Sequence, residues 1–248
     1  MYFKAKWMLF NLAVVVGLGG CHAPSTQGEN LRQVDISLSI NHQTDAKISQ
    51  GLPILIQAEL VDVAEKSPFS MPAKAKWEFQ IKDEKAKKQD WRLKTMQEPL
   101  CWSSAPETTK KLKVGSYEML AFLRLDKKII GQSGVYSVRI LTNEQGGFEK
   151  EKDLLKAEFY LLEKDYASAL KAVESLLNKQ PFDTDALLLK GEIFEKSGRK
   201  EEAVEAYAAV LPEIEGHSNQ VAITQRHNHL MLELLKEKSM KADSGDSK

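Results

Sequence analysis

The hydrophobic residues of this chain change their spacing once, and that change constrains the fold more than any other feature. Up to residue 142, apolar and polar residues alternate, as they do around Val34, Ile36 and Leu38. This period of two is typical of strands with one buried face. From residue 149, apolar residues recur three and four positions apart, which indicates helices with one buried side. The sequence therefore predicts an all-β domain over residues 34–142, followed by an all-α domain over residues 149–238.

The first residues have the features of a targeting signal. Lys4 and Lys6 precede an apolar run, residues 7–18, which contains no Pro, Asp or Glu and is too short to span a bilayer comfortably. The run ends in Leu18-Gly19-Gly20-Cys21, which resembles the lipobox of bacterial lipoproteins. The resemblance implies that residues 1–20 are a signal peptide, that Cys21 is acylated with palmitate, and that residues 21–33 form a polar tether. An ordinary signal peptide with a chance cysteine is the alternative.

The residue after the lipobox bears on the destination of such a protein. His22 follows Cys21, and the lack of an aspartate there resembles the lipoproteins sorted to the outer membrane. We therefore expect a protein of the bacterial cell envelope, anchored by lipid to the outer membrane and facing the periplasm.

Short alternating segments between residues 34 and 142 predict a β-sandwich. Trp77 stands where the central strand of an immunoglobulin-like domain often has a core tryptophan, and Gly115-x-Tyr117 resembles the tyrosine corner of that family. Met119 occupies the place of the second cysteine in the disulfide-bonded branch, from which this sequence departs. With Cys21 acylated, Cys101 is the one remaining thiol, and beside Trp102 it is expected to be a buried core residue.

One predicted strand has apolar residues on both faces. If Tyr117 and Met119 point inward, Leu120 and Phe122 point outward. Outward apolar residues at alternate positions usually have a cover, so we expect Leu120 and Phe122 to form the interface with the helical domain. Two exposed hydrophobic residues on an ordinary surface are the alternative.

The helical half repeats itself with a period of 34 residues. Ala157 and Gly191 are separated by this interval, as are Tyr160 and Phe194. The period and the small and aromatic residues at these places resemble the tetratricopeptide repeat (TPR). We expect two such units, with a capping helix over residues 218–238 and a disordered tail over residues 239–248. The cap is predicted to bury one stripe, made of Ile223, His227, Leu230, Met231, Leu234 and Leu235.

The TPR resemblance also implies a binding groove lined by the first helix of each unit. Its acidic and aliphatic residues favour a basic, partly apolar peptide or helix as the partner. The groove residues implied by the resemblance are Glu151, Leu154, Glu158, Leu161, Leu162, Asp185, Leu188, Glu192, Glu195 and Lys196.

The sequence offers no pattern that predicts chemistry. Lys and Arg number 35, as do Asp and Glu, and this balance argues against nucleic acid as a partner. His227 and His229 are two positions apart, which places them on different sides of a helix and excludes a shared metal. We therefore expect no enzyme activity, metal, cofactor or small-molecule substrate. The prediction is a membrane-anchored adaptor or assembly factor that binds protein through its TPR groove. Alternatively, the β-sandwich binds envelope glycan, peptidoglycan or protein, and the helices are structural.

Overall fold

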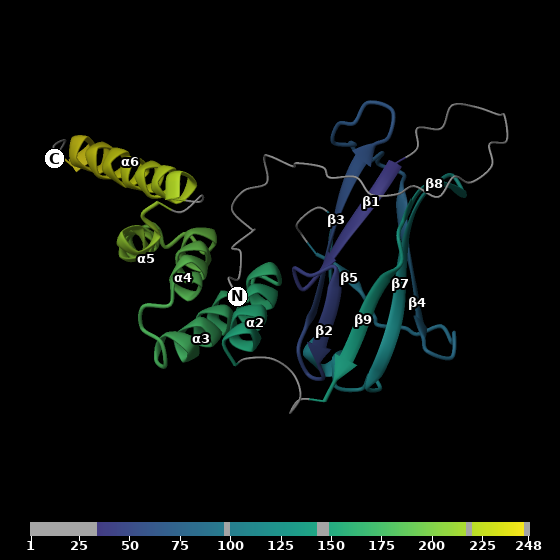
Figure 1. The fold of residues 1–248 in the computed structure, drawn as a ribbon. Coiled ribbons are helices and arrows are strands. Elements are labelled where there is room, and N and C mark those ends of the chain that lie inside the picture. Colours follow the sequence, from purple (N-terminus) through teal and green to yellow (C-terminus); the bar gives the residue numbers. More distant parts are fainter. Residues whose placement is uncertain (1–33, 97–99, 143–148, 217–219, 246–248) are drawn as a thin grey trace. The chain divides into compact units, whose positions relative to one another are not determined.

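The computed structural model describes residues 34–96, 100–142, 149–216 and 220–245, and residues 241–245 are described by their backbone alone. These residues fall into two compact units, which we call the β unit (34–142) and the helical unit (149–245) (Figure 1). Nine strands in one mixed sheet and six α-helices make this an α+β protein in the part that the structure describes. The signal peptide and the tether predicted over residues 1–33 lie outside the described residues.

The β unit contains every described strand and one short helix, α1, at Pro106–Thr109. Its strands alternate apolar and polar residues, so that β1 buries every second side chain. The strands are β1 Val34–Ile40, β2 Asp45–Ser49, β3 Ile54–Asp62, β4 Lys76–Asp83, β5 Lys94–Thr95, β6 Cys101–Ser104, β7 Gly115–Leu125, β8 Lys128–Ser133 and β9 Tyr136–Leu141.

The sheet is organised around β7. This strand pairs with β4 along one edge and with β8 and β9 along the other, all antiparallel. The first two strands then split between different neighbours, since β1 pairs antiparallel with β3 while β2 runs parallel to β9. Asn41 and His42 make this change of neighbour possible with positive φ angles of 47° and 62° at the end of β1. The full order is β2-β9-β7-β8-β1-β3-β6-β5, with β4 on the free side of β7.

The tryptophan at the centre of the β unit is Trp91, and the prediction of Trp77 for this place is wrong. Trp91 is 1% exposed and meets the ring of Tyr117 edge to face, with ring centroids 5.4 Å apart. Trp77 is half-buried because it lies on β4, which pairs with no described strand other than β7. The strand that follows Trp91, β5, begins only at Lys94, after a positive φ of 48° at Arg92. Cys101 is buried, as predicted.

The alternation expected along β7 is present on its inner face. Tyr117, Met119 and Leu123 are buried. On the other face Leu120 is half-buried and Phe122 is 9% exposed. Phe122 is thus not a freely exposed hydrophobic residue, while the predicted cover by the helical domain stays a prediction.

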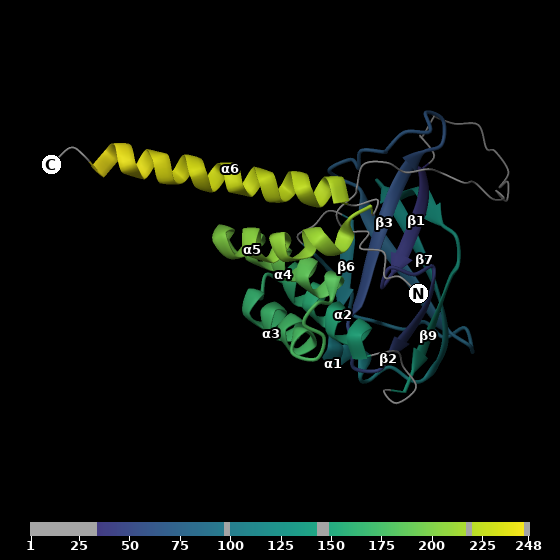
Figure 2. The same ribbon diagram turned by 60° about the vertical axis from the view of Figure 1, so that its left-hand side comes forward.

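The helical unit is a series of helices in which consecutive members pack side by side (Figures 1 and 2). Aspartates cap the N-termini of two of these helices. The side chain of Asp165 accepts a hydrogen bond from the Ser168 amide at the start of α3, and that of Asp183 accepts one from the Ala186 amide at the start of α4. The elements are α2 Glu149–Leu162, α3 Tyr166–Leu177, α4 Thr184–Lys196, α5 Lys200–Val210, the 3-10 helix η2 Leu211–Ile214 and α6 Gln220–Gly245.

The backbone makes the same turn at two helix ends that lie 34 residues apart in the sequence. At the end of α2 the Asp165 amide donates to the Tyr160 carbonyl at 2.9 Å, and at the end of α4 the Arg199 amide donates to the Phe194 carbonyl at 2.9 Å. The residue before each donor has a positive φ, 60° at Lys164 and 80° at Gly198. Both helices therefore end in the same left-handed turn.

Small residues bring the paired helices close together. Ala157, Ala169 and Ala203 are fully buried. At Gly191 a Cβ atom would lie 2.6 Å from the ring of Tyr207 on α5, a distance that no real contact allows. Only glycine therefore permits α5 to seat on α4 in this way.

The last helix differs from the predicted cap in two ways. It continues to Gly245, so the disordered tail expected from residue 239 is wrong over 239–245; the helix is extended through Lys, Met and Ala, which favour helix. The predicted stripe is also only half right. Ile223, Leu230 and Leu234 are buried, but Met231 and Leu235 are 43% and 58% exposed.

Candidate functional site

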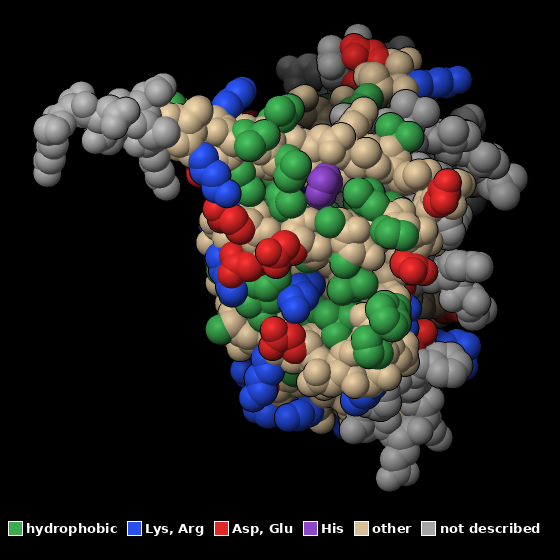
Figure 3. All heavy atoms as spheres, turned by 90° about the vertical axis from the view of Figure 1, so that its left-hand side faces the viewer, with side chains coloured by type: hydrophobic (Ala, Val, Ile, Leu, Met, Phe, Trp, Pro, Cys, Tyr) green, Lys and Arg blue, Asp and Glu red, His purple; other side chains and the backbone are tan. Residues whose placement is uncertain are grey.

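The surface of the helical unit carries the candidate site. Figure 3 shows one face of the molecule on which hydrophobic side chains reach the surface among basic and acidic ones, with a histidine between them. Phe182, in the turn between α3 and α4, is 80% exposed. Contiguous apolar patches mark surfaces that contact other molecules, so Phe182 is of interest together with the apolar residues beside it.

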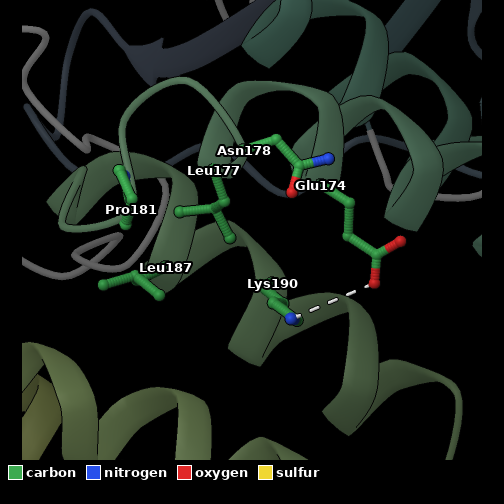
Figure 4. Close-up of a pocket in the computed structure, with 6 residues that line it drawn as sticks. All are labelled: Glu174, Leu177, Asn178, Pro181, Leu187 and Lys190. Carbon is green, nitrogen blue, oxygen red and sulfur yellow. Dashed lines mark ion pairs between the residues drawn. The ribbon is translucent and has the colours of Figure 1, made fainter.

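A hollow open to solvent lies beside that turn, between α3 and α4 (Figure 4). Leu177, Pro181 and Leu187 form its apolar side, and Glu174 and Lys190 form its charged side with their side-chain N and O atoms 4.0 Å apart. The lining contains no cysteine, histidine or serine that could act as a nucleophile or base. Its chemistry suits contact with a peptide side chain.

The aliphatic residues predicted for the groove do not line an open surface. Leu154 and Leu161 lie in the core that α2 shares with α3, and Leu188 lies in the core around Tyr207. Leu162 is 5% exposed. The groove assignment is therefore wrong for these four leucines, because the helices that carry them pack against neighbours on more than one side.

The polar groove residues stay nearer the surface but are largely paired within the chain. Glu192 is 8% exposed and its carboxylate lies 3.5 Å from the ammonium of Lys196. The Asp185 carboxylate lies 2.9 Å from the ammonium of Lys150, which also contacts Asp183 at 2.6 Å. Burial opposes the charge on Lys150, but the hydrogen bonds that its ammonium donates to Asp183 and Asp185 outweigh burial and raise the pKa of Lys150.

Glu195 belongs to a second network, which joins three helices. Its carboxylate accepts hydrogen bonds from Tyr207 Oη on α5 at 2.9 Å and from Arg226 Nε on α6 at 2.6 Å. Burial raises the pKa of the Tyr207 hydroxyl well above its usual range. The Arg226 guanidinium is partly desolvated, yet the hydrogen bond to Glu195 raises its pKa. These groups hold α4, α5 and α6 together and leave little free charge on this part of the surface.

Two further predicted carboxylates lie on the first helix of the array. Glu151 and Glu158, both on α2, are half-buried. The Oε2 atom of Glu151 is buried and has no hydrogen-bond partner among the described residues. A buried acceptor without a donor is costly, and Glu151 is the predicted groove residue that carries such an oxygen in the described part of the chain.

An exposed stripe on α6 was missed by sequence reasoning. Val221, Leu232 and Met240 are 66%, 56% and 64% exposed, in addition to Met231 and Leu235. The signal was present in the sequence, since Val221, Leu232 and Met240 lie outside the predicted buried stripe and widen the apolar arc of the helix. His227 is half-buried with its Nδ1 atom 3.1 Å from Asn228 Oδ1, and His229 is exposed with its Nε2 atom 3.2 Å from Glu233.

The β unit has one surface of comparable interest. Trp77 and Phe79 on β4 are half-buried and pack against the buried Trp102, with ring centroids 4.8 Å and 5.0 Å away. The Trp77 indole nitrogen also donates to the sulfur of Met71, which is 44% exposed. Aromatic side chains at the edge of a sheet are suited to bind sugar rings or an added peptide strand.

No protein-family model matches this sequence, and no curated protein is significantly similar to it. Within the described residues, no helix has the length and apolar character needed to cross a membrane. In the same residues, no group of three or more His, Cys, Asp and Glu side chains is arranged to hold a metal ion.

Proposed function

We propose that this chain is a periplasmic lipoprotein, anchored to the membrane through Cys21, that acts as an adaptor or assembly factor by binding protein through its helical unit. The observation that carries the proposal is the repeated turn, in which Asp165–Tyr160 and Arg199–Phe194 make the same hydrogen bond 34 residues apart. Together with the contact of Gly191 and Tyr207, this supports two TPR-like units. Stacked units of this kind expose extended binding surfaces.

We also propose that the β unit is an immunoglobulin-like sandwich. Two features support it. The first is the change of neighbour between β1 and β2, by which the opening segment joins both β3 and β9. The second is the tyrosine corner, since Tyr117 Oη donates to the Lys113 carbonyl four residues earlier at 2.7 Å.

The membrane anchor rests on the lipobox-like sequence at Cys21. The test is metabolic labelling with palmitate in a bacterial host, followed by separation of inner and outer membranes. The full chain is expected to take up label and to fractionate with the outer membrane, and Cys21→Ser is expected to remain unlabelled. Equal labelling of both proteins would remove the anchor from the proposal.

The partner proposed for the groove is a basic, partly apolar peptide or helix. Glu151 and Glu158 are the acidic residues that the prediction places on the first helix of the groove, and both are half-buried on α2. In-cell crosslinking with the chain as bait should capture a partner, and Glu158→Lys should weaken that capture. Glu205→Lys is the matched control, because Glu205 is exposed on α5 and was not assigned to the groove. Capture that survives Glu158→Lys would contradict this groove.

The aromatic edge of the β unit favours a second candidate function, binding of envelope glycan, peptidoglycan or protein by the β unit itself. Trp77 and Phe79 are the residues that support it, because their rings are half-buried beside an edge strand. Trp77→Ala should then abolish co-sedimentation with purified peptidoglycan, while Glu158→Lys should leave it unchanged. The opposite result would assign binding to the helical unit.

A further inference from the structure

The 34-residue register places α6 as the first helix of a third, incomplete unit. The first helix of the second unit, α4, begins at Thr184, and α6 begins close to the position 34 residues further on. Ile223 is fully buried, like its counterpart Leu189 at 8% exposure. Gly198 turns the chain back after α4, with a positive φ. The residue 34 positions after Gly198 is Leu232, where the chain does not turn, because α6 continues as a helix to Gly245. The third unit therefore has a first helix and no second helix among the described residues.

In the complete second unit, α5 covers one side of α4. Leu187, Gly191 and Phe194 lie on that side, three or four residues apart. The ring of Tyr207 meets Gly191, and Phe194 lies in the core formed with α5. A second helix thus seals this stripe of the first helix.

No described residue outside α6 is known to cover the equivalent stripe of α6, whose members are exposed. Its members, which we call the open stripe, are Val221, Gln225, Asn228, Leu232 and Leu235. All five are exposed, and the apolar ones are 66%, 56% and 58% exposed at Val221, Leu232 and Leu235. Figure 2 shows that α6 extends past α5 at its C-terminal end. A third unit would place its second helix on the open stripe.

The charges along α6 indicate what kind of helix fits there. Both acidic residues between 220 and 240 face the chain's own α5, because Glu233 and Glu237 lie 2.9 Å and 2.7 Å from the ammonium of Lys200. Lys236 and Lys238 border the open stripe and make no ion pair with any described residue. The open stripe of α6 is thus an apolar surface with a basic border. A partner surface that complements it is apolar with an acidic border.

We propose that the open stripe of α6 is a docking site for an amphipathic helix of a partner protein whose apolar face is bordered by Asp and Glu, and that this helix completes the third unit in trans. The proposal rests on the adaptor function and names a partner for a surface separate from the groove on α2. A second copy of this chain is a poor occupant, because an α6–α6 contact would bring Lys236 and Lys238 of both copies together.

The test uses two fluorescent stapled helices with the same Leu and Ala stripe, one bordered by Glu and the other by Lys, and measures anisotropy with the full chain. The Glu-bordered helix should bind more tightly. Lys236→Glu/Lys238→Glu should weaken the binding of the Glu-bordered helix about tenfold and should strengthen the binding of the Lys-bordered helix, because each charge contact changes sign. Lys171→Glu, an exposed lysine on α3, should change neither. Leu232→Ser/Leu235→Ser should abolish both interactions without a change in circular dichroism, because the two leucines are exposed.

Several results would overturn the proposal. Equal affinity for both helices, or affinity that survives Leu232→Ser/Leu235→Ser, would place binding elsewhere. Dimers in analytical ultracentrifugation that Leu232→Ser/Leu235→Ser dissociates would make a second copy the occupant. Binding to phosphatidylglycerol vesicles but to neither helix would make it a lipid surface. Failure of the adaptor function can be told apart from failure of this inference. If the chain is not an adaptor, crosslinking captures no partner. If only the open stripe is wrongly assigned, Leu232→Ser/Leu235→Ser still captures the partner.

Discussion

The side chain of Arg226 on α6 donates to that of Glu195 on α4 at 2.6 Å, and this contact joins two helices that are separated in the sequence by α5. Tyr207 on the intervening α5 donates to the same carboxylate oxygen. Glu195 and Arg226 are 26% and 29% exposed, so water screens the pair less than it screens a surface ion pair. The contact holds α6 against the array and thereby fixes which of its sides is open.

Replacing Arg226 with Ala should lower the stability of the helical unit. The change leaves the Glu195 carboxylate with one donor in place of two, and we expect a loss of about 1–2 kcal/mol in the free energy of unfolding. Urea denaturation followed by circular dichroism measures it. Glu202→Ala breaks the exposed pair with Arg199 and should cost less than about 1 kcal/mol. Equal losses in the two variants would show that the Glu195–Arg226 contact has no special weight.

The stability of the helical unit should fall in alkali. Burial raises the pKa of Tyr207 above its ordinary value of 10.0, so the folded-state pKa exceeds the unfolded-state pKa. Below pH 10 the neutral Tyr207 phenol contributes its full share to the free energy of unfolding. This share is lost as the pH rises above 10, because the unfolded state then releases the phenol proton more readily than the folded state does. One such proton gives a slope of up to about 1.4 kcal/mol per pH unit.

Tyr207→Phe isolates this effect. The variant lacks the titrating hydroxyl, so its free energy of unfolding should fall less steeply between about pH 9 and 11 than that of the wild type. Tyr166→Phe removes the hydroxyl of a half-buried tyrosine on α3 and serves as the control. Parallel curves for the wild type and Tyr207→Phe would mean that other groups cause the alkaline loss.

Gly191→Ala should destabilise the contact of α4 with α5. In an open helix this change would add about 1 kcal/mol of stability. Here the new Cβ atom meets the ring of Tyr207 at 2.6 Å, and Tyr207 is fully buried and cannot move aside. We expect overpacking to outweigh the helix preference and leave a net loss of about 1–2 kcal/mol in urea denaturation. Gly134→Ala, which meets no atom within 4 Å, should be neutral.

The regular parts of the fold were accessible from the sequence because they depend on local periodicity. The alternation at Val34–Ile40 predicted β1, and the 34-residue interval between Ala157 and Gly191 predicted two matching helix pairs. Turn chemistry was equally local, as at Gly198 with its positive φ. Patterns of this kind describe one element and its immediate neighbour.

The errors arose where burial depends on which neighbour is present. Leu154 and Met231 both lie on apolar stripes, yet Leu154 is buried in the core between helices and Met231 is 43% exposed. Ion pairs such as Lys150–Asp183 join helices far apart in the sequence, and no periodicity encodes them. The acidic groove residues were therefore identified without the cations that neutralise them.

The hydroxyl of Tyr117 should contribute measurably to the stability of the β unit. It donates to the Lys113 carbonyl at 2.7 Å, while its ring packs against Trp91. Tyr117→Phe keeps the ring and removes the hydrogen bond, so we expect a loss of about 1 kcal/mol in the free energy of unfolding. Tryptophan fluorescence during urea denaturation reports on this unit, because all described tryptophans lie in it. An unchanged transition midpoint would show that the corner contributes no stability.

Two leucines on α6, Leu230 and Leu232, should respond differently to the same substitution. Leu230 is 4% exposed in the core shared with α5, and Leu230→Ala should cost about 2–4 kcal/mol because it leaves a cavity. Leu232 is 56% exposed on the open stripe, and Leu232→Ala should change the free energy of unfolding by less than about 0.5 kcal/mol. Thermal denaturation of the two variants at low protein concentration distinguishes them. A large loss for Leu232→Ala would mean that the open stripe is covered in solution, and a small loss for Leu230→Ala would mean that α6 does not pack on α5.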